Sequence, residues 1–451
     1  MLNRSQSRRV LLFLLAIGLV WISACTPGEV PISEPIQAPE VTPGTCLVAP
    51  AITQGPINSL VYCVNHGPWA VVTDQTLPYA QAAGVTLVRF PGGNWGDEND
   101  LQPYQVDQFV TLARQLGSEV SLNVRLFGGS PEKAAALVRY ANIDNDYGIR
   151  YWAIGNEPTL YATARGVPDY GVEQFNADWR SFAEAMKAVD ESILLIGPEL
   201  HQFGPDLAST PKDPFGLDWM SEFLEANGDL VDIVSIHRYP FPQGGGGRAA
   251  TIEELAAASK EWDEIIPYLR ALIFEKTGEN KPIAVTEVNS HWSNAIGGEA
   301  TPDSFMNAIW WADALGRMIT NQVDIVNYFS LQSHPSIGGY GLLARSQPRP
   351  TYYVYQIYQA FGQDLVFAAC DDPDLGIYAA TGTEGGLAVI IVNLGSAAQN
   401  PPVLIEGEDA NLAAVWRFDE ANLLHALDAS GEQLGDSWHL PGYTITLLKF
   451  E

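Results

Sequence analysis

Residues 152–158 read Trp-Ala-Ile-Gly-Asn-Glu-Pro, a short apolar run that stops on an Asn-Glu pair and is broken by a proline. Residues 282–287, Pro-Ile-Ala-Val-Thr-Glu, have the same form. A short apolar run between turn residues is typical of a buried β-strand. The two runs therefore predict two strands, one ending near Glu157 and the other near Glu287.

Similar apolar runs alternate with longer amphipathic stretches from about Ile57 onward, which indicates repeated βα units around a parallel sheet. Eight such units predict a closed (β/α)8 TIM barrel rather than an open doubly wound sheet. We predict barrel strands near 58–64, 85–91, 119–126, 149–157, 193–199, 231–239, 282–288 and 324–331. Helices are predicted at Val106–Leu116, Pro131–Ala141, Val172–Val189, Ile252–Lys276 and Pro302–Ile319.

The pattern changes after the last helix, which we expect to end near Phe361. Short alternating strands follow, at Gly376–Ala380, Leu387–Val392, Ala413–Phe418 and Tyr443–Phe450. They predict a C-terminal antiparallel β-sandwich domain. The expected domains are a signal peptide (1–24), a Pro-rich tether (25–54), the catalytic barrel (55–363) and the β-sandwich (364–451).

The N-terminus has the pattern of an export signal: three arginines precede the apolar stretch from Val10 to Trp21, and Ser23-Ala24-Cys25 follows it. Cys25 resembles the lipidated cysteine of bacterial lipoproteins, which implies a lipid-anchored protein facing outside the cytoplasm, in the periplasm or at the cell surface. The alternative is an ordinary secretory signal with a coincidental cysteine.

The net charge excludes some partners. It is −29, and removing residues 1–24, which hold three arginines and no acids, changes it to −32. Such a surface repels phosphate backbones and anionic lipid, so we expect no nucleic-acid partner and no membrane contact except through the anchor. The oligomeric state is not predicted.

Three further cysteines leave two disulfides open, because Cys46 could pair with Cys63 or with Cys370. No His or Cys spacing resembles a zinc site, and the acidic loops lack the spacing of a calcium-binding EF-hand. Gly244 to Gly247 is not followed by the residues of a phosphate-binding loop, so we interpret it as a flexible loop. We predict neither a metal nor a cofactor.

Function in a (β/α)8 barrel gathers at the C-terminal ends of the strands, which is where Glu157 and Glu287 fall. Two carboxyl groups in different environments are what glycosidic bond cleavage requires. One gives a proton to the leaving oxygen, and the other attacks the anomeric carbon or activates water. The pair therefore predicts a glycosidase.

Gly155-Asn156-Glu157-Pro158 and Thr286-Glu287 resemble the catalytic motifs of clan A glycoside hydrolases, which are retaining (β/α)8 barrels. The resemblance implies Glu157 as acid/base and Glu287 as nucleophile. Within the clan, the chain is most similar to families 51, 39 and 79, the arabinofuranosidase- or xylosidase-like group. The stretches that carry this similarity are 89–95 (Arg-Phe-Pro-Gly-Gly-Asn-Trp), 140–142 (Tyr-Ala-Asn) and 440–448.

The resemblance also implies roles for other strand-end residues. Arg89 would hold Glu287 ionised, Tyr239 would hydrogen-bond it, and Asn156 would bind the sugar hydroxyl next to the anomeric carbon. The remaining predicted sugar contacts are His237, Asn94, Trp95 and Trp292.

Each of these side chains also has a structural interpretation. Asn156 could cap a helix, and Arg89 could form a salt bridge below the barrel mouth. His237 and Tyr239 could be a hydrogen-bonded floor, and the tryptophans could pack in the core. Phe329, at the end of the eighth strand, is interpreted as packing.

The leading hypothesis is a retaining glycoside hydrolase that cleaves O-glycosidic bonds of polysaccharides or oligosaccharides. A transglycosylase would use the same residues, and a lipid-anchored carbohydrate-binding protein on an inactive barrel is the alternative from another class. Three features combine the patterns of different families, so the sequence does not specify the sugar. They are the proline after Gly-Asn-Glu, the short loop from Pro240 to Gly247 and the absence of a strand-eight tryptophan.

Overall fold

The computed structural model describes residues 38–242, 248–293, 295–333, 339–382, 385–407, 411–428, 433–434 and 437–451. The predicted signal peptide, Cys25 and the loop glycines 244–247 lie outside these ranges. Residues 40–451 form one compact unit. No helix within the described ranges is long and apolar enough to cross a membrane.

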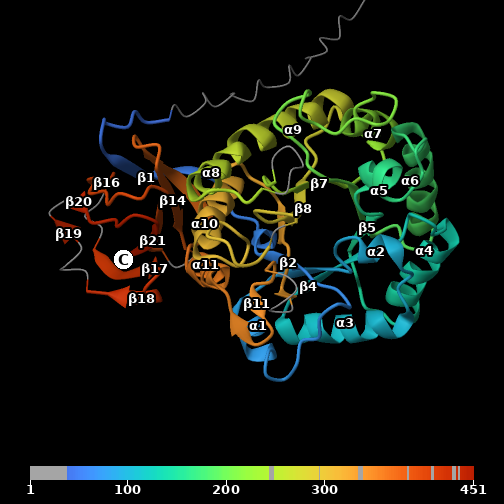
Figure 1. Ribbon diagram of the computed structural model, residues 1–451, viewed down its shortest axis with the longest axis horizontal. Coiled ribbons are helices and arrows are strands. Elements are labelled where there is room, and N and C mark those ends of the chain that lie inside the picture. Colours follow the sequence, from blue (N-terminus) through green and yellow to red (C-terminus); the bar gives the residue numbers. More distant parts are fainter. Residues whose placement is uncertain are drawn as a thin grey trace, which may run out of the picture. The chain divides into compact units, whose positions relative to one another are not determined.

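Eight parallel strands close into a barrel, which confirms the predicted fold class. They are β2 (Cys63–Asn65), β3 (Leu87–Phe90), β4 (Glu119–Val124), β5 (Tyr151–Ile154), β6 (Leu194–Leu200), β7 (Ile233–Arg238), β8 (Ile283–Val288) and β9 (Ile325–Tyr328). Figure 1 shows the helices arranged as a ring around these strands. The predicted first strand begins too early, because Ser59–Val61 is a 3-10 helix whose preceding residue, Asn58, caps it through its side chain.

The helices of the barrel are α1 (Leu77–Ala82), α2 (Trp95–Glu98), α3 (Pro103–Leu116), α4 (Pro131–Val138), α5 (Tyr161–Ala164), α6 (Val172–Lys187), α7 (Trp219–Asn227), α8 (Ile252–Ala258), α9 (Trp262–Thr277), α10 (Phe305–Thr320) and α11 (Pro350–Gln359). The helix predicted over 252–276 is two helices joined by the 3-10 turn Ser259–Glu261. The helix predicted from Pro302 begins at Phe305, because the hydroxyl of Ser304 accepts from the amide of Asn307 and caps it.

An apolar cluster with members from seven strands fills the barrel interior: Cys63, Leu87, Tyr151, Ala153, Ile196, Ile233, Ala284 and Ile325. Because side chains alternate along a strand, these positions define which later residues of each strand face inward. This alternation is regular in β5 but shifts in β6, between Gly197 and Leu200, and at the end of β8. Both shifts lie next to the site described below.

The C-terminal region is one sheet of eight strands in the order β16-β1-β13-β14-β15-β21-β17-β18. The strands are β1 (Cys46–Pro56), β13 (Asp364–Cys370), β14 (Leu375–Thr381), β15 (Leu387–Asn393), β16 (Val403–Ile405), β17 (Leu412–Asp419), β18 (Leu423–Leu427) and β21 (Thr444–Phe450). All neighbours are antiparallel except β1 and β16, which are parallel. Both faces are buried: Ile377 and Val389 join the sheet's own apolar cluster, whereas Tyr378 and Ile390 join the main core.

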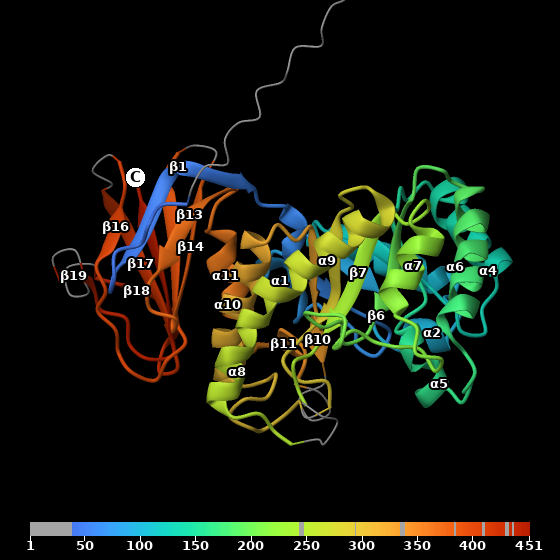
Figure 2. The ribbon, with the colours of Figure 1, turned by 90° about the horizontal axis from the view of Figure 1, so that it is seen from above.

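The predicted tether extends too far, because its last residues belong to β1. This strand, blue in Figure 2, lies among the orange strands of the C-terminal sheet. The run from Cys46 to Ala49 is apolar and is buried against β13 and β16. An apolar run that can pair on both edges is more stable as a strand than in solvent.

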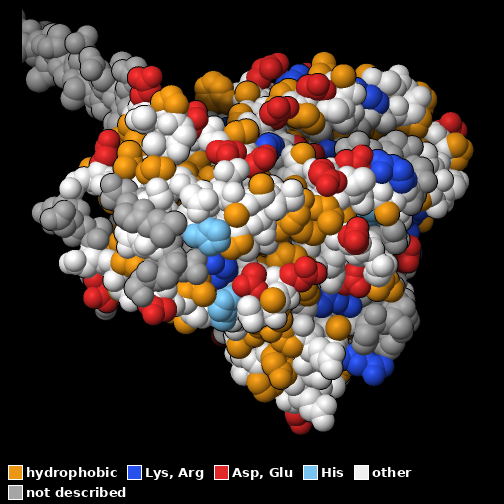
Figure 3. All heavy atoms as spheres, turned by 60° about the vertical axis from the view of Figure 1, so that its left-hand side comes forward, with side chains coloured by type: hydrophobic (Ala, Val, Ile, Leu, Met, Phe, Trp, Pro, Cys, Tyr) orange, Lys and Arg blue, Asp and Glu red, His pale blue; other side chains and the backbone are white. Residues whose placement is uncertain are grey.

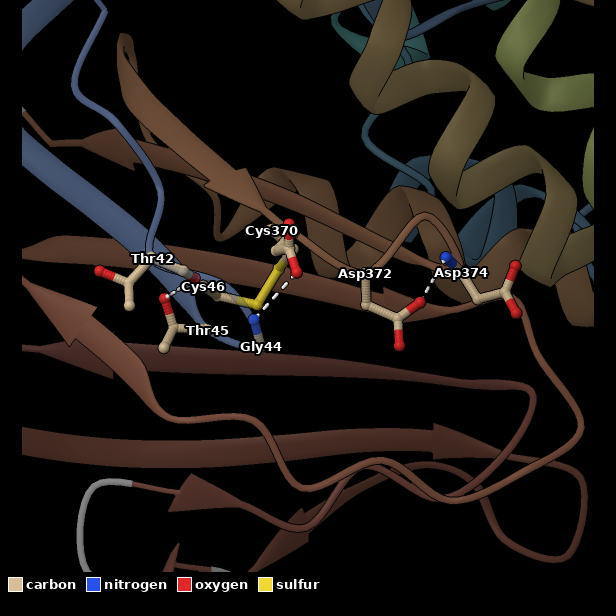
Figure 4. The surroundings of a disulfide bond; sticks show 8 residues. Thr42, Gly44, Thr45, Cys46, Cys370, Asp372 and Asp374 are labelled. Carbon is tan, nitrogen blue, oxygen red and sulfur yellow. Dashed lines mark hydrogen bonds between the residues drawn. A yellow bond between two sulfur atoms is a disulfide. The ribbon is translucent and has the colours of Figure 1, made fainter.

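The disulfide joins Cys46 to Cys370, which are directly opposite each other in the β1–β13 ladder (Figure 4). Of the two pairings that the sequence left open, the structure has this one. Cys63 is a buried free cysteine at the start of β2. The disulfide therefore fixes the N-terminal strand to the C-terminal sheet.

A buried carboxylate on α10 connects the barrel to the sheet. Asp313 accepts hydrogen bonds from the hydroxyls of Ser259 (2.7 Å) and Tyr378 (2.6 Å) and from Nε of Arg317 (2.7 Å). Gly376, two residues before Tyr378 on β14, leaves room for it, since a Cβ there would lie 1.9 Å from Asp313 Oδ1. Elsewhere on the surface, acidic side chains are scattered over the face shown in Figure 3.

Candidate active site

The ends of strands β3, β5, β6, β7 and β8 bring five charged side chains together at the barrel mouth. They are Arg89, Glu157, Glu199, His237 and Glu287. Arg89, Glu199 and His237 are fully buried, Glu287 is 4% exposed, and the side chain of Glu157 is 15% exposed. We call this set the charged cluster. It contains three carboxylates and two basic groups.

Arg89 is the centre of the charged cluster. Its Nη1 donates to Glu287 Oε1 (2.9 Å) and to Asn65 Oδ1 (2.9 Å). Its Nη2 donates to Glu199 Oε2 (2.5 Å) and to Asn156 Oδ1 (3.0 Å). The planar guanidinium thus fixes two carboxylates and two amides. Its rigid arrangement of N–H donors is suited to binding several acceptors at once.

Glu287 is held by three donors from three different segments. Besides Arg89, the backbone amide of Gly93 (2.8 Å) donates to Oε1, and the Tyr239 hydroxyl (3.0 Å) donates to Oε2. Gly93 has φ of 61°, in the left-handed region that favours glycine. The predicted contacts of Arg89 and Tyr239 with Glu287 are therefore present in the structure.

Glu157 has a different environment. It follows β5 in the left-handed region (φ 48°), and its Oε1 lies 3.0 Å from His237 Nδ1. A non-glycine residue in this region is strained, and such strain persists where surrounding structure holds the residue in place. Carboxylate oxygens of Glu157 and Glu287 and a ring nitrogen of His237 all lie within 4.8 Å of one another.

Glu199 was not among the predicted site residues, yet it completes the charged cluster. Its Oε2 lies 3.0 Å from Nε2 of His237, and its backbone also has positive φ (60°). Counting alternate positions from Ile196, which faces the interior, places Glu199 on the outside of β6. The register shift after Gly197 turns it inward instead.

The charges explain the protonation of the cluster. Burial acts to lower the pKa of His237, but the charge of Glu287, the hydrogen bonds to Glu157 and Glu199 and the charge of Glu199 outweigh it and raise that pKa to about 10. Burial acts to raise the pKa of Glu199, but the charge of Arg89 and the hydrogen bond from His237 lower it to about 2. For Glu157, burial is likewise outweighed by His237, so the pKa of Glu157 is lowered in the ligand-free site. His237 is therefore a cation that donates from both nitrogens.

Glu157, His237 and Glu287 are also close enough to share a metal ion. However, both nitrogens of His237 already face carboxylates, and both oxygens of Glu287 accept from protein donors. A metal would have to displace these hydrogen bonds. The donor set is thus better explained as a hydrogen-bonded network than as a metal site.

A cavity of about 790 Å³ opens above the charged cluster. This volume is in the range of about 300–1,000 Å³ that is usual for pockets holding small organic ligands. Its described lining is Gly93, Asn94, Glu157, Leu160, His201, Gln202, Ser209, Arg238, Tyr239, Pro240, Pro242, Glu287, Trp292, Phe329 and Tyr340.

Of the predicted sugar contacts, Asn94, Tyr239 and Trp292 line the cavity. Asn156 lies just below, where its Nδ2 is 3.4 Å from Asn94 Oδ1. Trp95 begins α2 and is outside the described lining, so its contact stays a prediction. Phe329, interpreted from the sequence as packing, is part of the cavity wall.

No protein-family model matches the chain. Among curated proteins, it is 27% identical over 227 residues to an intracellular exo-α-(1→5)-L-arabinofuranosidase of Halalkalibacterium halodurans (41% of this chain, 42% of the relative). It is 26% identical over 416 residues to endoglucanase A of Paenibacillus lautus (79% of this chain, 55% of the relative). The chain thus spans about half the length of the curated relatives it matches.

Solved structures of similar fold include a bifunctional glucanase-xylanase from a metagenome library (TM-score 0.70, 17% identity, 90% of this chain and 98% of that one). An α-L-arabinofuranosidase from Thermotoga maritima has a TM-score of 0.70 at 16% identity, covering 90% of this chain and 99% of that one. A family 44 xyloglucanase from Paenibacillus polymyxa has 0.69 at 16% identity, covering 90% and 99%. These comparisons confirm the resemblance to clan A glycoside hydrolases, with family 44 beside family 51. At these identities the structural likeness concerns the fold.

Proposed function

We propose that the chain is a retaining glycoside hydrolase in which Glu287 is the nucleophile and Glu157 the acid/base. The observation that carries this proposal is the arrangement of the two carboxylates, whose oxygens lie within 4.8 Å at the floor of one cavity. Carboxyl groups about 5–5.5 Å apart suit double displacement, whereas inversion needs about 6.5–9.5 Å to admit a water between them. The similarity to named glycosidases supports the same reaction class.

The contacts support this division of roles. Glu287 accepts three hydrogen bonds, including one from an arginine, which suits a carboxylate that attacks the anomeric carbon while ionised. The carboxylate of Glu157 has His237 as its one hydrogen-bond partner among the described residues, and it is the most exposed of the three acids. It is therefore the carboxyl free to reach a leaving oxygen.

Glu157 must carry a proton to act first as the acid. With all five groups ionised the charged cluster has a net charge of −1, so one proton makes it neutral. The cation of His237 lowers the pKa of Glu157 in the ligand-free site, and burial acts in the opposite direction. A sugar that fills the cavity expels water and strengthens the effect of burial, so substrate binding favours the protonated acid.

In the first step, Glu287 attacks the anomeric carbon, and the bond from that carbon to the leaving oxygen breaks as Glu157 transfers its proton to that oxygen. In the second step, Glu157 takes a proton from water, and the resulting hydroxide displaces Glu287 from the anomeric carbon. Asn156, whose Oδ1 accepts a hydrogen bond from Arg89, would bind the neighbouring hydroxyl of the sugar.

The test is a screen of chromogenic pentosides, hexosides and uronides beside xylan, arabinan and β-glucan, followed by NMR of the first-formed anomer. We expect retention of configuration, and activity reduced at least about 10³-fold in Glu157→Gln on unactivated substrates and in Glu287→Gln. Glu191→Gln, at an exposed turn, is the matched control and keeps full activity. Unaltered turnover in both active-site variants would overturn the proposal, and an excess of longer oligosaccharides among the products would indicate transglycosylation.

Export and lipid anchoring at Cys25 are a separate proposal, which the sequence motif alone supports. Labelling of bacteria expressing the full chain with radioactive palmitate tests it. We expect label in the wild type and none in Cys25→Ala, and an unlabelled wild type would indicate an ordinary secretory signal.

A further inference from the structure

Three aromatic rings form a continuous strip from the charged cluster to the protein surface. The ring of Phe329 lies over Gly93, since a Cβ on that glycine would be 3.3 Å from it and 3.9 Å from Glu287 Oε1. Trp69, in the loop after β2, has its ring centre 6.0 Å from that of Phe329, with the planes tilted by 33°. Tyr340 contacts the edge of Phe329, at 5.7 Å and 77°. We call these three residues the aromatic strip.

Trp69 is held in place but not covered. Its ring packs on the backbone of the preceding turn, because a Cβ at Gly67 would lie 2.0 Å from the indole. Even so, 40% of the residue is exposed. An exposed indole in a fixed orientation next to Phe329, a residue of the cavity wall, is a surface suited to binding, since large apolar groups are usually buried unless they have a partner.

The direction of the aromatic strip determines which part of a substrate it meets. Phe329 lies beside Glu287, the proposed nucleophile, since both are next to Gly93. The nucleophile bonds to the sugar on the non-leaving side of the scissile bond. Trp69 lies one ring further out, so it meets the next sugar of the chain on that side.

The chemistry of a flat indole face selects the kind of sugar. A pyranose chair with equatorial substituents presents a broad face of axial C–H bonds, which matches an aromatic ring. A furanose ring is smaller and puckered, and it carries substituents on both faces. The aromatic strip therefore fits a chain of gluco- or xylo-configured pyranoses better than an arabinofuranose branch.

We propose that Trp69 and Phe329 form an outer sugar-binding subsite on the nucleophile side of the cavity, so that the substrate is a pyranose chain rather than a single sugar. This rests on the proposed function for the position of the bond, but the binding of a chain does not require cleavage. Another exposed indole, Trp292 (50% exposed), lines the cavity and is linked to the aromatic strip, since the Tyr340 hydroxyl donates to its carbonyl oxygen (2.6 Å).

Binding is measured by calorimetry with cellohexaose, xylohexaose and α-1,5-arabinohexaose on the full chain carrying Glu287→Gln, which prevents turnover. Adding Trp69→Ala is expected to weaken the binding of cellohexaose or xylohexaose about 3- to 10-fold, the effect of losing one aromatic stacking contact. Adding Phe274→Ala, at an aromatic residue on α9 that is 56% exposed, is the matched control and leaves the affinity unchanged. Equal affinities with and without Trp69, or arabinohexaose as the tightest ligand, would overturn the inference.

Turnover separates this inference from the proposed function. In the active protein, Trp69→Ala is expected to lower kcat/KM more on the aryl glycoside of a trisaccharide than on that of a monosaccharide. If kcat/KM falls equally on the two glycosides while Glu157→Gln is inactive, the proposed subsite is wrong and the proposed glycosidase function is supported. If no glycoside is cleaved while hexaose binding still depends on Trp69, the proposed subsite is supported and the proposed glycosidase function is wrong.

Discussion

Glu199→Gln tests the electrostatic account of the charged cluster. The substitution keeps the shape of the side chain and removes one negative charge. In the wild type that charge lies 2.5 Å from Arg89 Nη2 and 3.0 Å from His237 Nε2, with no exposed surface. In the variant, the buried cations Arg89 and His237 therefore have one fewer negative charge beside them.

The substitution is expected to change both the stability of the protein and the pKa of His237. Breaking a buried ion pair costs about 3–5 kcal/mol of stability. In addition, a single opposite charge at this separation shifts a pKa by about 1–3 units. The pKa of His237, about 10 in the wild type, should fall by that amount in the variant.

The direction in which each pKa is shifted determines how stability changes with pH. The pKa of His237 is raised from 6.5, so its stabilising contribution is complete below pH 6.5 and is lost as the pH rises through about 10. In Glu199→Gln the same loss moves to about pH 7–9. The pKa of Glu199 is lowered from 4.5, so the wild type loses its contribution as the pH falls from 4.5 through about 2, and the variant has none to lose.

The assay is the thermal midpoint from about pH 4 to 10, measured together with kcat/KM on the best chromogenic substrate. We expect the variant to be less stable throughout, with an additional fall between pH 7 and 9, where its activity should also decline. Glu191→Gln is again the control for removing a carboxylate. A midpoint difference between variant and wild type that is constant from pH 6 to 9 would falsify the reasoning.

Three other outcomes are expected. Cys370→Ser removes a cross-link between residues 324 positions apart and should cost about 2–5 kcal/mol; dithiothreitol should lower the wild-type thermal midpoint but not the variant's, and an unaffected wild type would contradict this. Tyr378→Phe leaves the carboxylate of Asp313 short of one donor and should cost about 1–3 kcal/mol in urea unfolding without a change in kcat; a variant as stable as wild type would contradict it. Tyr239→Phe removes a donor to the proposed nucleophile and should lower kcat/KM about 10- to 100-fold at an unchanged thermal midpoint; a loss of stability alone would indicate a structural role.

The pair Glu157 and Glu287 could be recognised from local sequence because each acid follows a strand-like apolar run. Arg89, Asn156 and Tyr239 followed from the motif resemblance, and the structure brings them to the same place. Glu199 also ends an apolar run, within β6, but local sequence alone did not single it out. Its inward orientation depends on a register shift between β6 and β7, which is a property of the paired strands.

The sequence could not show that residues 46–54 belong to a strand, because the partner strands of β1 lie more than 300 residues away in the chain. Trp69 was overlooked for a related reason. In sequence it is a lone aromatic in a loop, and its relation to the cavity exists through Phe329, from the opposite end of the barrel sequence.

The sequence by itself determined the class of fold and the two acids, because hydrophobic periodicity and strand-terminal residues are local properties that each segment carries alone. The tertiary structure decided the disulfide, the third carboxylate and the route of the aromatic strip. These depend on distances between residues far apart in the chain, which are set when the barrel closes and the sheet assembles its strands from both ends of the molecule.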